Sequence, residues 1–180
     1  MTNKYEIRLC GYGGQGVILA GFIIGQAASV YEKKNAIFIQ DYGPEARGGA
    51  CRADVIIANE PILYPYIDAP SVLVAMSQEA YQKYLPKNRS DTIVIIDEDL
   101  VMPGVKAPLK LVMMPARKIA EELGRQAVAN VVMLGFLTSI TNALSIDAMK
   151  QSILASIPKG TEKLNIDAFE RGYASAQKRG

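Results

Sequence analysis

The sequence predicts an α/β fold: a three-layer, Rossmann-like open sheet, mostly parallel with one antiparallel strand, followed by a helical C-terminal third. Three observations support this prediction. Short apolar runs alternate with segments of helical period as far as Met114, and only helical segments follow. A glycine-rich turn at residues 11–16 joins the first apolar run to the first helical segment. A second glycine-rich loop at residues 43–49 joins the second and third apolar runs.

The first strand is predicted at residues 6–10, directly before the glycine turn. Gly11, Gly13 and Gly16 have the G-x-G-x-x-G spacing, with a strand before it and a helix after it, as that motif requires. Glycine has no Cβ and can adopt positive φ, so a ligand or another backbone can approach closely. Free N–H groups at the helix start would favour a phosphate or a carboxylate. The alternative interpretation is a tight strand-to-helix turn without a ligand.

The first helix is predicted over residues 17–32, where apolar residues recur at i, i+3 and i+4. The second strand, residues 36–40, completes a right-handed β-α-β unit. Only ten residues, 41–50, separate it from the third strand, residues 51–59, and Pro44 is one of them. Because this is too short for a crossover helix, we predict that the second and third strands are antiparallel. The 43–49 loop then lies at the same sheet edge as the glycine turn, where ligands gather in open α/β sheets.

The later elements follow from the same periodicities. Residues 60–66 form an extended connection with two prolines. Residues 131–137 are apolar nearly all round, so their helix is either central or covered by a partner. The other predicted strands are residues 71–75, 92–96 and 110–114, and the other predicted helices are residues 78–84, 116–123, 127–144, 146–156 and 162–177.

Length and composition predict one domain spanning residues 1–180. The chain is 49% hydrophobic and 21% charged, with a net charge of +2, so nothing indicates binding to nucleic acid or to a membrane surface. Its polar first residues leave no room for a signal peptide, and no apolar run approaches the roughly 20 residues of a membrane span. We therefore expect a cytoplasmic protein.

The chain has no histidine and only two cysteines, Cys10 and Cys51. The commonest general base and metal ligand is therefore missing. Two widely spaced cysteines exclude a C-x-x-C zinc site and a four-cysteine iron–sulfur cluster within this chain alone, so no metal site is predicted. We expect both thiols to be buried as small hydrophobic groups.

A dinucleotide site would need an acidic residue about 20 residues after the glycines, at the end of the second strand. Glu32 has roughly this spacing but falls at the end of the helix, and Asp41 lies about thirty residues on. Gln40 occupies the position expected to face the ribose. A self-contained dehydrogenase is therefore the weaker hypothesis.

The 43–49 loop presents Glu45 and Arg47 between a proline and two adjacent glycines. One interpretation is a surface hairpin whose two charges pair with each other. The other is a docking or anion-contacting loop, because the arginine fork suits carboxylates and phosphates.

Both glycine-rich segments carry a family resemblance. Residues 11–17 read GYGGQGV and residues 41–50 read DYGPEARGGA. Together they resemble the gamma subunit of the 2-oxoacid:ferredoxin oxidoreductases, the pyruvate ferredoxin oxidoreductase gamma family. The similarity covers essentially the whole chain, including Asn130 and Gly135, and the GPEARGG loop makes it specific. The alanine after Glu45 is more similar to the 2-oxoglutarate branch than to the pyruvate branch.

The resemblance implies a multisubunit enzyme that converts a 2-oxoacid, coenzyme A and oxidised ferredoxin into acyl-CoA, carbon dioxide and reduced ferredoxin. It implies that thiamine diphosphate and iron–sulfur clusters are held by partner subunits: alpha, beta and, in some complexes, a ferredoxin-like delta. It assigns no catalytic residue to this chain and allows a contact with coenzyme A. The candidate ligand-contact or subunit-interface residues are Gly11, Gly13, Gly14, Gln15, Gly16, Glu45, Arg47, Gly48 and Gly49.

Two alternatives stay open: a stand-alone nucleotide-binding oxidoreductase of Rossmann type, and a pure assembly scaffold. We also expect the isolated chain to form a homodimer. Its apolar helix at residues 131–137 and the segment from Tyr64 to Tyr66 would otherwise leave apolar patches exposed.

Overall fold

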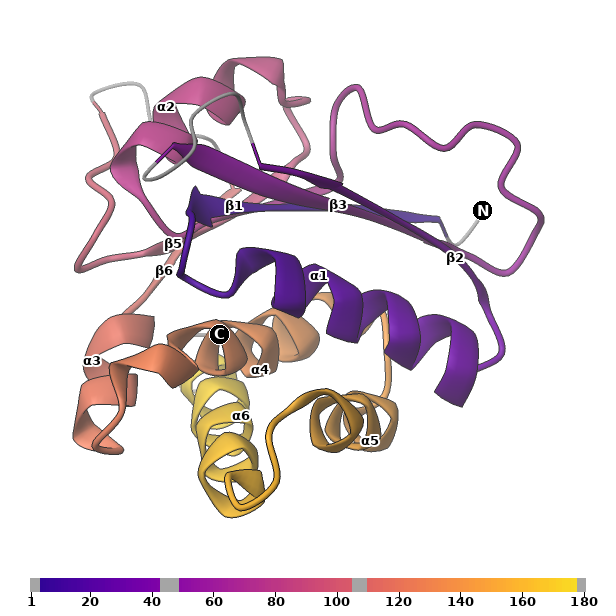
Figure 1. Ribbon diagram of the computed structural model, residues 1–180. Coiled ribbons are helices and arrows are strands. Elements are labelled where there is room, and N and C mark those ends of the chain that lie inside the picture. The colour runs from indigo at the N-terminus through magenta and orange to yellow at the C-terminus, as the bar shows by residue number, and fades with distance from the viewer. Residues whose placement is uncertain (1–3, 43–48, 105–109, 178–180) are drawn as a thin grey trace.

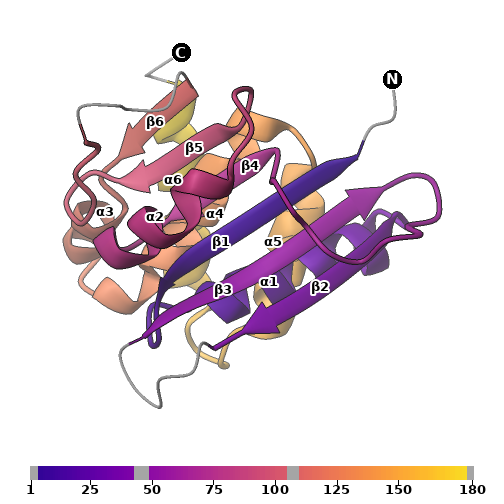
Figure 2. The same ribbon diagram turned by 90° about the horizontal axis from the view of Figure 1, so that it is seen from above.

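Six strands form one sheet in the computed structural model, which describes residues 4–42, 49–104 and 110–177. The strand order is β2-β3-β1-β4-β5-β6 (Figure 2). β3 is antiparallel to both of its neighbours, β1 and β2, whereas β1, β4, β5 and β6 pair in parallel. The strands are β1 (Tyr5–Tyr12), β2 (Asn35–Asp41), β3 (Ala50–Ala58), β4 (Val72–Ala75), β5 (Ile93–Asp97) and β6 (Lys110–Met114).

Helices cover both faces of this sheet (Figure 1). α2 lies on one face, and α1 and α4 lie on the other, with α5 and α6 beyond them (Figure 1). The predicted mostly parallel α/β fold is therefore confirmed. The helices are α1 (Val17–Gln26), α2 (Gln78–Tyr84), α3 (Ala116–Glu122), α4 (Ala129–Thr141), α5 (Ile146–Ser156) and α6 (Glu162–Gln177).

The predicted antiparallel pairing of the second and third strands is confirmed. Asp41, the last residue of β2, lies opposite Arg52, which in turn lies opposite Cys10 of β1. The C-terminal ends of β1 and β2 therefore lie at the same edge of the sheet, as expected. β1 and β2 run in the same direction, and β3 lies between them.

Two predicted helices differ from the structure at their ends. The helix predicted over residues 17–32 is α1 continued by a π-helical turn, Ala27–Tyr31. The helix predicted over residues 127–144 begins with a short 3-10 turn and ends at Thr141, because Asn142 adopts the left-handed conformation with φ of 49°.

The apolar helix α4 is buried within this chain. All of its residues from Asn130 to Thr138 are buried, so the central position is the correct one of the two that its composition allowed. The expectation that this helix would leave an apolar patch exposed is therefore wrong. Tyr64 and Tyr66, the other segment expected to be exposed, are 55% and 58% exposed, and self-association of the isolated chain stays a prediction. α4 crosses α6 so closely that a Cβ on Gly135 would overlap the backbone of Phe169, and a Cβ on Gly172 would overlap that of Val132.

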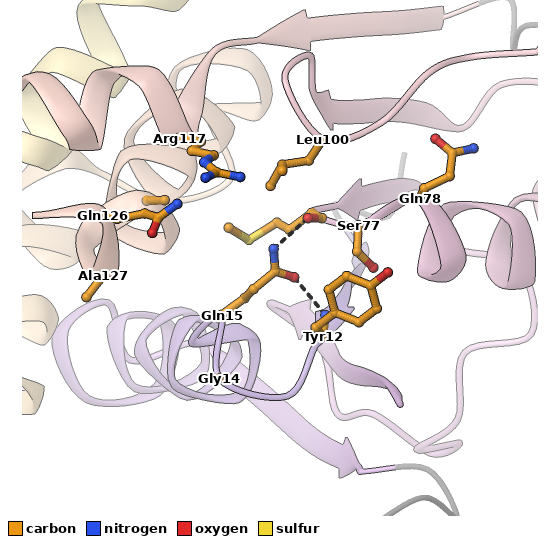
Figure 3. Close-up of a pocket in the computed structure, with 11 residues that line it drawn as sticks. Tyr12, Gly14, Gln15, Ser77, Gln78, Leu100, Arg117, Gln126 and Ala127 are labelled. Atoms are coloured by element: carbon orange, nitrogen blue, oxygen red, sulfur yellow. Dashed lines mark hydrogen bonds between the residues drawn. The ribbon is translucent and has the colours of Figure 1, made fainter. Parts of the chain in front are cut away.

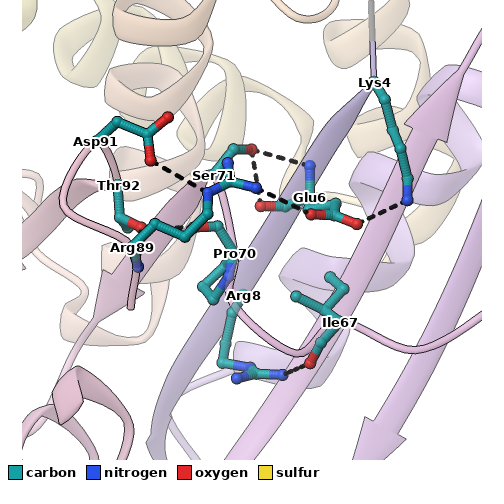
Figure 4. Close-up of polar contacts among 9 residues, drawn as sticks. All are labelled: Lys4, Glu6, Arg8, Ile67, Pro70, Ser71, Arg89, Asp91 and Thr92. Carbon is teal, nitrogen blue, oxygen red and sulfur yellow. Dashed lines mark hydrogen bonds and ion pairs between the residues drawn. The ribbon is translucent and has the colours of Figure 1, made fainter. Parts of the chain in front are cut away.

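A buried ion pair holds the extended connection between β3 and β4 against the sheet. The Arg8 side chain on β1 is 1% exposed and donates two hydrogen bonds of 2.7 Å to the Asp54 carboxylate on β3. It donates a third hydrogen bond, also 2.7 Å, to the Ile67 carbonyl in the connection (Figure 4). The hydrogen bond to Ile67 therefore ties this connection to β1, and removing Asp54 would leave the buried guanidinium charge alone.

Cys10 and Cys51 are buried free thiols, as predicted. Burial raises the pKa of the Cys10 thiol far above its usual range. Within the described residues, no helix combines the length and apolar character needed to cross a membrane.

The close crossing of α4 and α6 predicts an unequal response to two glycine substitutions. Gly172→Ala should lower the free energy of unfolding by about 1–3 kcal/mol, because the added methyl forces the helix backbones apart. Gly25→Ala, in α1, is the matched control: its Cβ would lie 3.5 Å from the Phe38 Cβ, an ordinary contact. The control should be neutral or stabilising, since alanine is more favourable than glycine in a helix interior by roughly 1 kcal/mol. Equal losses in urea unfolding would contradict this account.

Candidate functional site

A cavity of about 620 Å³ lies where β1 and β4 end side by side (Figure 3). From β1 the chain moves outward to β2 and β3, and it then returns to β4 on the other side of β1. In open α/β sheets such a switch point, at the carboxyl ends of parallel strands, is where ligands bind. The cavity is lined by Tyr12, Gly14, Gln15, Met76, Ser77, Gln78, Leu100, Arg117, Gln126, Ala127 and Ala129.

Gln15 joins the two strand ends at the floor of this cavity. Its Oε1 accepts a hydrogen bond of 2.7 Å from the Tyr12 backbone N–H, and its Nε2 donates one of 2.7 Å to the Met76 carbonyl (Figure 3). A Cβ on Gly11 would lie only 2.5 Å from the Gln15 Oε1, so the glycine leaves room for this amide. Gly11 and Gln15, both predicted site residues, therefore pack against each other.

Gly16 makes a second packing contact, with Asn130 at the start of α4. The Asn130 amide donates a hydrogen bond of 3.2 Å to the Gly16 carbonyl, and a Cβ on Gly16 would overlap that amide. Gly16 also has a positive φ of 72°, which glycine adopts without strain. The turn is thereby fixed to both β4 and α4.

Gly13 and Gly14 differ from the other two glycines of the turn. A Cβ on either would meet nothing within 4 Å, and Gly14 has a φ of 100°. Their backbone is open to an approaching group, and Gly14 lines the cavity. Of the motif, Gly11 and Gly16 are required by packing and Gly14 by its positive φ, whereas Gly13 has neither constraint.

The second predicted loop is only partly described. Glu45, Arg47 and Gly48 lie outside the described residues. Gly49 is buried directly before β3, and the next residue, Ala50, lies opposite Tyr12 of β1. The end of this loop therefore lies beside the start of the glycine turn, as the shared sheet edge predicted.

Arg117, which the sequence analysis did not single out, brings a cation to the cavity. It stands in the first turn of α3, and its Nε lies 2.9 Å from the Glu121 carboxylate one turn later. The side chain is 42% exposed, so the guanidinium is also available to a ligand. Its position just after a parallel strand was the signal in the sequence, because β6 ends at the same sheet edge as β1 and β4.

Asp97 connects two segments of the cavity wall. Its carboxylate accepts hydrogen bonds from the backbone N–H of Asp99, 3.1 Å, and of Arg117, 2.9 Å. It thereby joins the turn that carries Leu100 to the start of α3. Burial raises the pKa of this carboxyl to about 6, although both N–H donors favour its charged form.

None of the acidic residues considered for a dinucleotide ribose lines the cavity. Glu32 pairs with Lys34 at 2.7 Å and accepts a hydrogen bond from the Ser145 N–H. Asp41 lies 3.4 Å from the Arg52 guanidinium. In the described part of the chain, no group of three or more cysteine, aspartate or glutamate side chains is placed to hold a metal ion.

Comparison with protein families places these features in context. The sequence model of the pyruvate ferredoxin/flavodoxin oxidoreductase family matches residues 6–175. The chain is 48% identical over 179 residues to 2-oxoglutarate synthase subunit KorC of Methanocaldococcus jannaschii, which covers 97% of this chain and 95% of the relative. It is 31% identical to ketoisovalerate oxidoreductase subunit VorA of Methanothermobacter marburgensis, covering 98% of this chain but only 37% of that relative.

Solved structures share the fold. The keto/oxoacid ferredoxin oxidoreductase gamma subunit from Geobacter sulfurreducens is 36% identical with a TM-score of 0.86, and 97% of each chain is covered. The 2-oxoglutarate:ferredoxin oxidoreductase from Magnetococcus marinus, solved with 2-oxoglutarate, coenzyme A and succinyl-CoA bound, has a TM-score of 0.85 at 24% identity. In that case 97% of this chain matches 31% of the other.

The buried carboxyl of Asp97 predicts a pH-dependent stability. Because its pKa is about 6 in the fold and about 4 in an unfolded chain, the folded state binds more protons between these values. The free energy of unfolding should therefore fall as pH rises from about 4 to 6, and stay level above that. A difference of about two pKa units corresponds to roughly 3 kcal/mol, so this is the largest decline that we expect.

Urea unfolding at a series of pH values checks this prediction. Asp97→Asn should lose the decline between pH 4 and 6, whereas Asp91→Asn, an exposed carboxyl two residues before β5, should keep it. An unchanged profile for Asp97→Asn would show that another group titrates.

Proposed function

The chain belongs to the pyruvate ferredoxin/flavodoxin oxidoreductase family, and we propose that it is the gamma subunit of a 2-oxoglutarate:ferredoxin oxidoreductase. The complex would convert 2-oxoglutarate, coenzyme A and oxidised ferredoxin into succinyl-CoA, carbon dioxide and reduced ferredoxin. The observation that carries the proposal is the 48% identity to a 2-oxoglutarate synthase subunit over nearly the whole of both chains. In this proposal residues 1–180 act as a single domain.

This chain does not supply the redox cofactors in the proposed complex. Its two cysteines are buried and it has no histidine, so its donor set does not fit an iron–sulfur cluster. Thiamine diphosphate and the clusters would be held by alpha and beta subunits and, in a four-subunit complex, by a ferredoxin-like delta subunit. A stand-alone nucleotide-binding oxidoreductase is less well supported, because Glu32, Gln40 and Asp41 do not line the cavity.

The switch-point cavity is the proposed contact for coenzyme A. Coenzyme A is a nucleotide with several phosphate charges, and the cavity combines the Arg117 guanidinium with the open backbone at Gly14. The arginine fork and backbone N–H groups both suit phosphate oxygens. Gln15 and Asp97 would act as positioning residues, since Gln15 holds the floor of the cavity and Asp97 holds one wall.

The 43–49 loop with Glu45 and Arg47 remains a proposed docking or anion-contacting loop. Gly49, at the end of this loop, lies beside the glycine turn, so the loop is attached close to the sheet edge at which the cavity lies.

The VorA relative supports a larger neighbour for this domain, since it carries a homologous segment within a chain almost three times as long.

Arg117→Ala in the reconstituted complex tests the cavity assignment. Loss of a charge-assisted hydrogen bond costs about 1.5–3 kcal/mol, so the KM for coenzyme A should rise roughly tenfold to a hundredfold. The KM for 2-oxoglutarate should not change. Arg171→Ala is the matched control: its guanidinium is 43% exposed and pairs with Glu122, but it does not line the cavity.

Two results would contradict the proposals in different ways. An unchanged KM for coenzyme A in Arg117→Ala would remove this cavity from the coenzyme site. Turnover of 2-oxoglutarate with a viologen dye by the purified chain alone, without partner subunits, would overturn its assignment as a subunit that lacks the redox cofactors.

A further inference from the structure

Helix α1 and its π-helical extension carry an apolar stripe that is exposed to solvent. Leu19, Phe22 and Val30 are 37%, 45% and 48% exposed. They follow one another at helical spacing, with Gln26 between the last two, so they lie along one side of α1 and its π-helical extension. No charged residue occurs between Arg8 and Glu32. Residues 9–31 therefore contribute no charge to the surface.

Helix α4 also has no charged residue, and in this helix the lack of charge accompanies burial. Its residues from Asn130 to Thr138 are buried under other elements. The helices with solvated faces, α2, α3, α5 and α6, all carry charged side chains. A charge-free helix with an exposed apolar stripe is therefore the exception, and depletion of charge is the compositional mark of the core of a protein interface.

The edge strand β2 continues this apolar stripe. The Phe38 ring meets the Phe22 ring edge to face, with centroids 6.3 Å apart. β2 is an outermost strand of the sheet, and its residues from Ala36 to Ile39 are only half-buried. We name Leu19, Phe22, Val30 and Phe38, with the outer edge of β2, the α1–β2 surface.

The length of the VorA relative indicates the occupant of this surface. Nearly all of this chain matches 37% of the VorA relative, so in that protein the other 63% belongs to the same polypeptide. A domain joined in this way has a permanent neighbour, and permanent interfaces are more apolar than transient ones. We propose that the larger subunit, the counterpart of the remainder of VorA, packs against the α1–β2 surface. This proposal rests on the proposed function, because it requires this chain to be a subunit.

Phe22→Glu, in a chain co-expressed with that larger subunit, tests the proposal. A charge at the centre of the interface should weaken the affinity between the subunits about tenfold or more. Leu154→Glu is the matched control, since Leu154 is 44% exposed on α5, outside the surface. Val30→Glu is a second variant that leaves the contact between the Phe22 and Phe38 rings intact. Circular dichroism of each purified variant establishes that it is folded.

The outcomes separate this proposal from the proposed function. If the unsubstituted chain binds no larger subunit, the proposed function fails. If it binds, and both Phe22→Glu and Val30→Glu bind as strongly as Leu154→Glu, the α1–β2 surface is not the docking site. If Phe22→Glu only dissociates a dimer of the isolated chain and leaves the complex intact, the occupant is a second copy and the proposal is overturned.

Discussion

The side-chain amide of Gln15 is the contact on which the cavity depends. β1 and β4 are parallel neighbours, and their ladder ends where the chain leaves each strand. Gln15 continues the connection beyond that point, since it accepts from Tyr12 and donates to Met76. Each neutral hydrogen bond contributes only about 1 kcal/mol, so the main effect is geometric. The bond pair holds the turn after β1 against the end of β4 and thereby sets the floor of the cavity.

The glycines of the turn serve this arrangement in two ways. Gly11 leaves room for the Gln15 amide, and Gly16 leaves room for Asn130. Gly13 and Gly14 have no neighbour that would exclude a side chain; the φ of 100° at Gly14 favours glycine there, whereas neither packing nor backbone conformation explains Gly13. On the opposite wall, the buried Asp97 holds the start of α3 as Gln15 holds the turn. The cavity is thus built from polar contacts between segments far apart in sequence, with Arg117 as its cation.

Much of the fold followed from local pattern and chain length. The antiparallel pairing of β2 and β3 was predictable because ten residues cannot contain a crossover helix. The hydrogen bond between the two cavity walls was not predictable, because Asp97 and Arg117 are twenty residues apart and meet only through the pairing of β5 and β6. The apolar pattern of α4 allowed either a central helix or a helix covered by a partner. The close crossing of α4 and α6 at Gly135 and Gly172, which no sequence periodicity shows, makes α4 a central helix.

Amide hydrogen exchange in the assembled complex tests the central claim most directly, namely that the cavity between the β1 and β4 ends is the coenzyme A contact. Exchange would be followed by mass spectrometry with and without coenzyme A. Our account predicts slower exchange on adding coenzyme A in two segments of this chain, the glycine turn and the start of α3. Slower exchange confined to the partner subunits, with both of these segments unchanged, would contradict it.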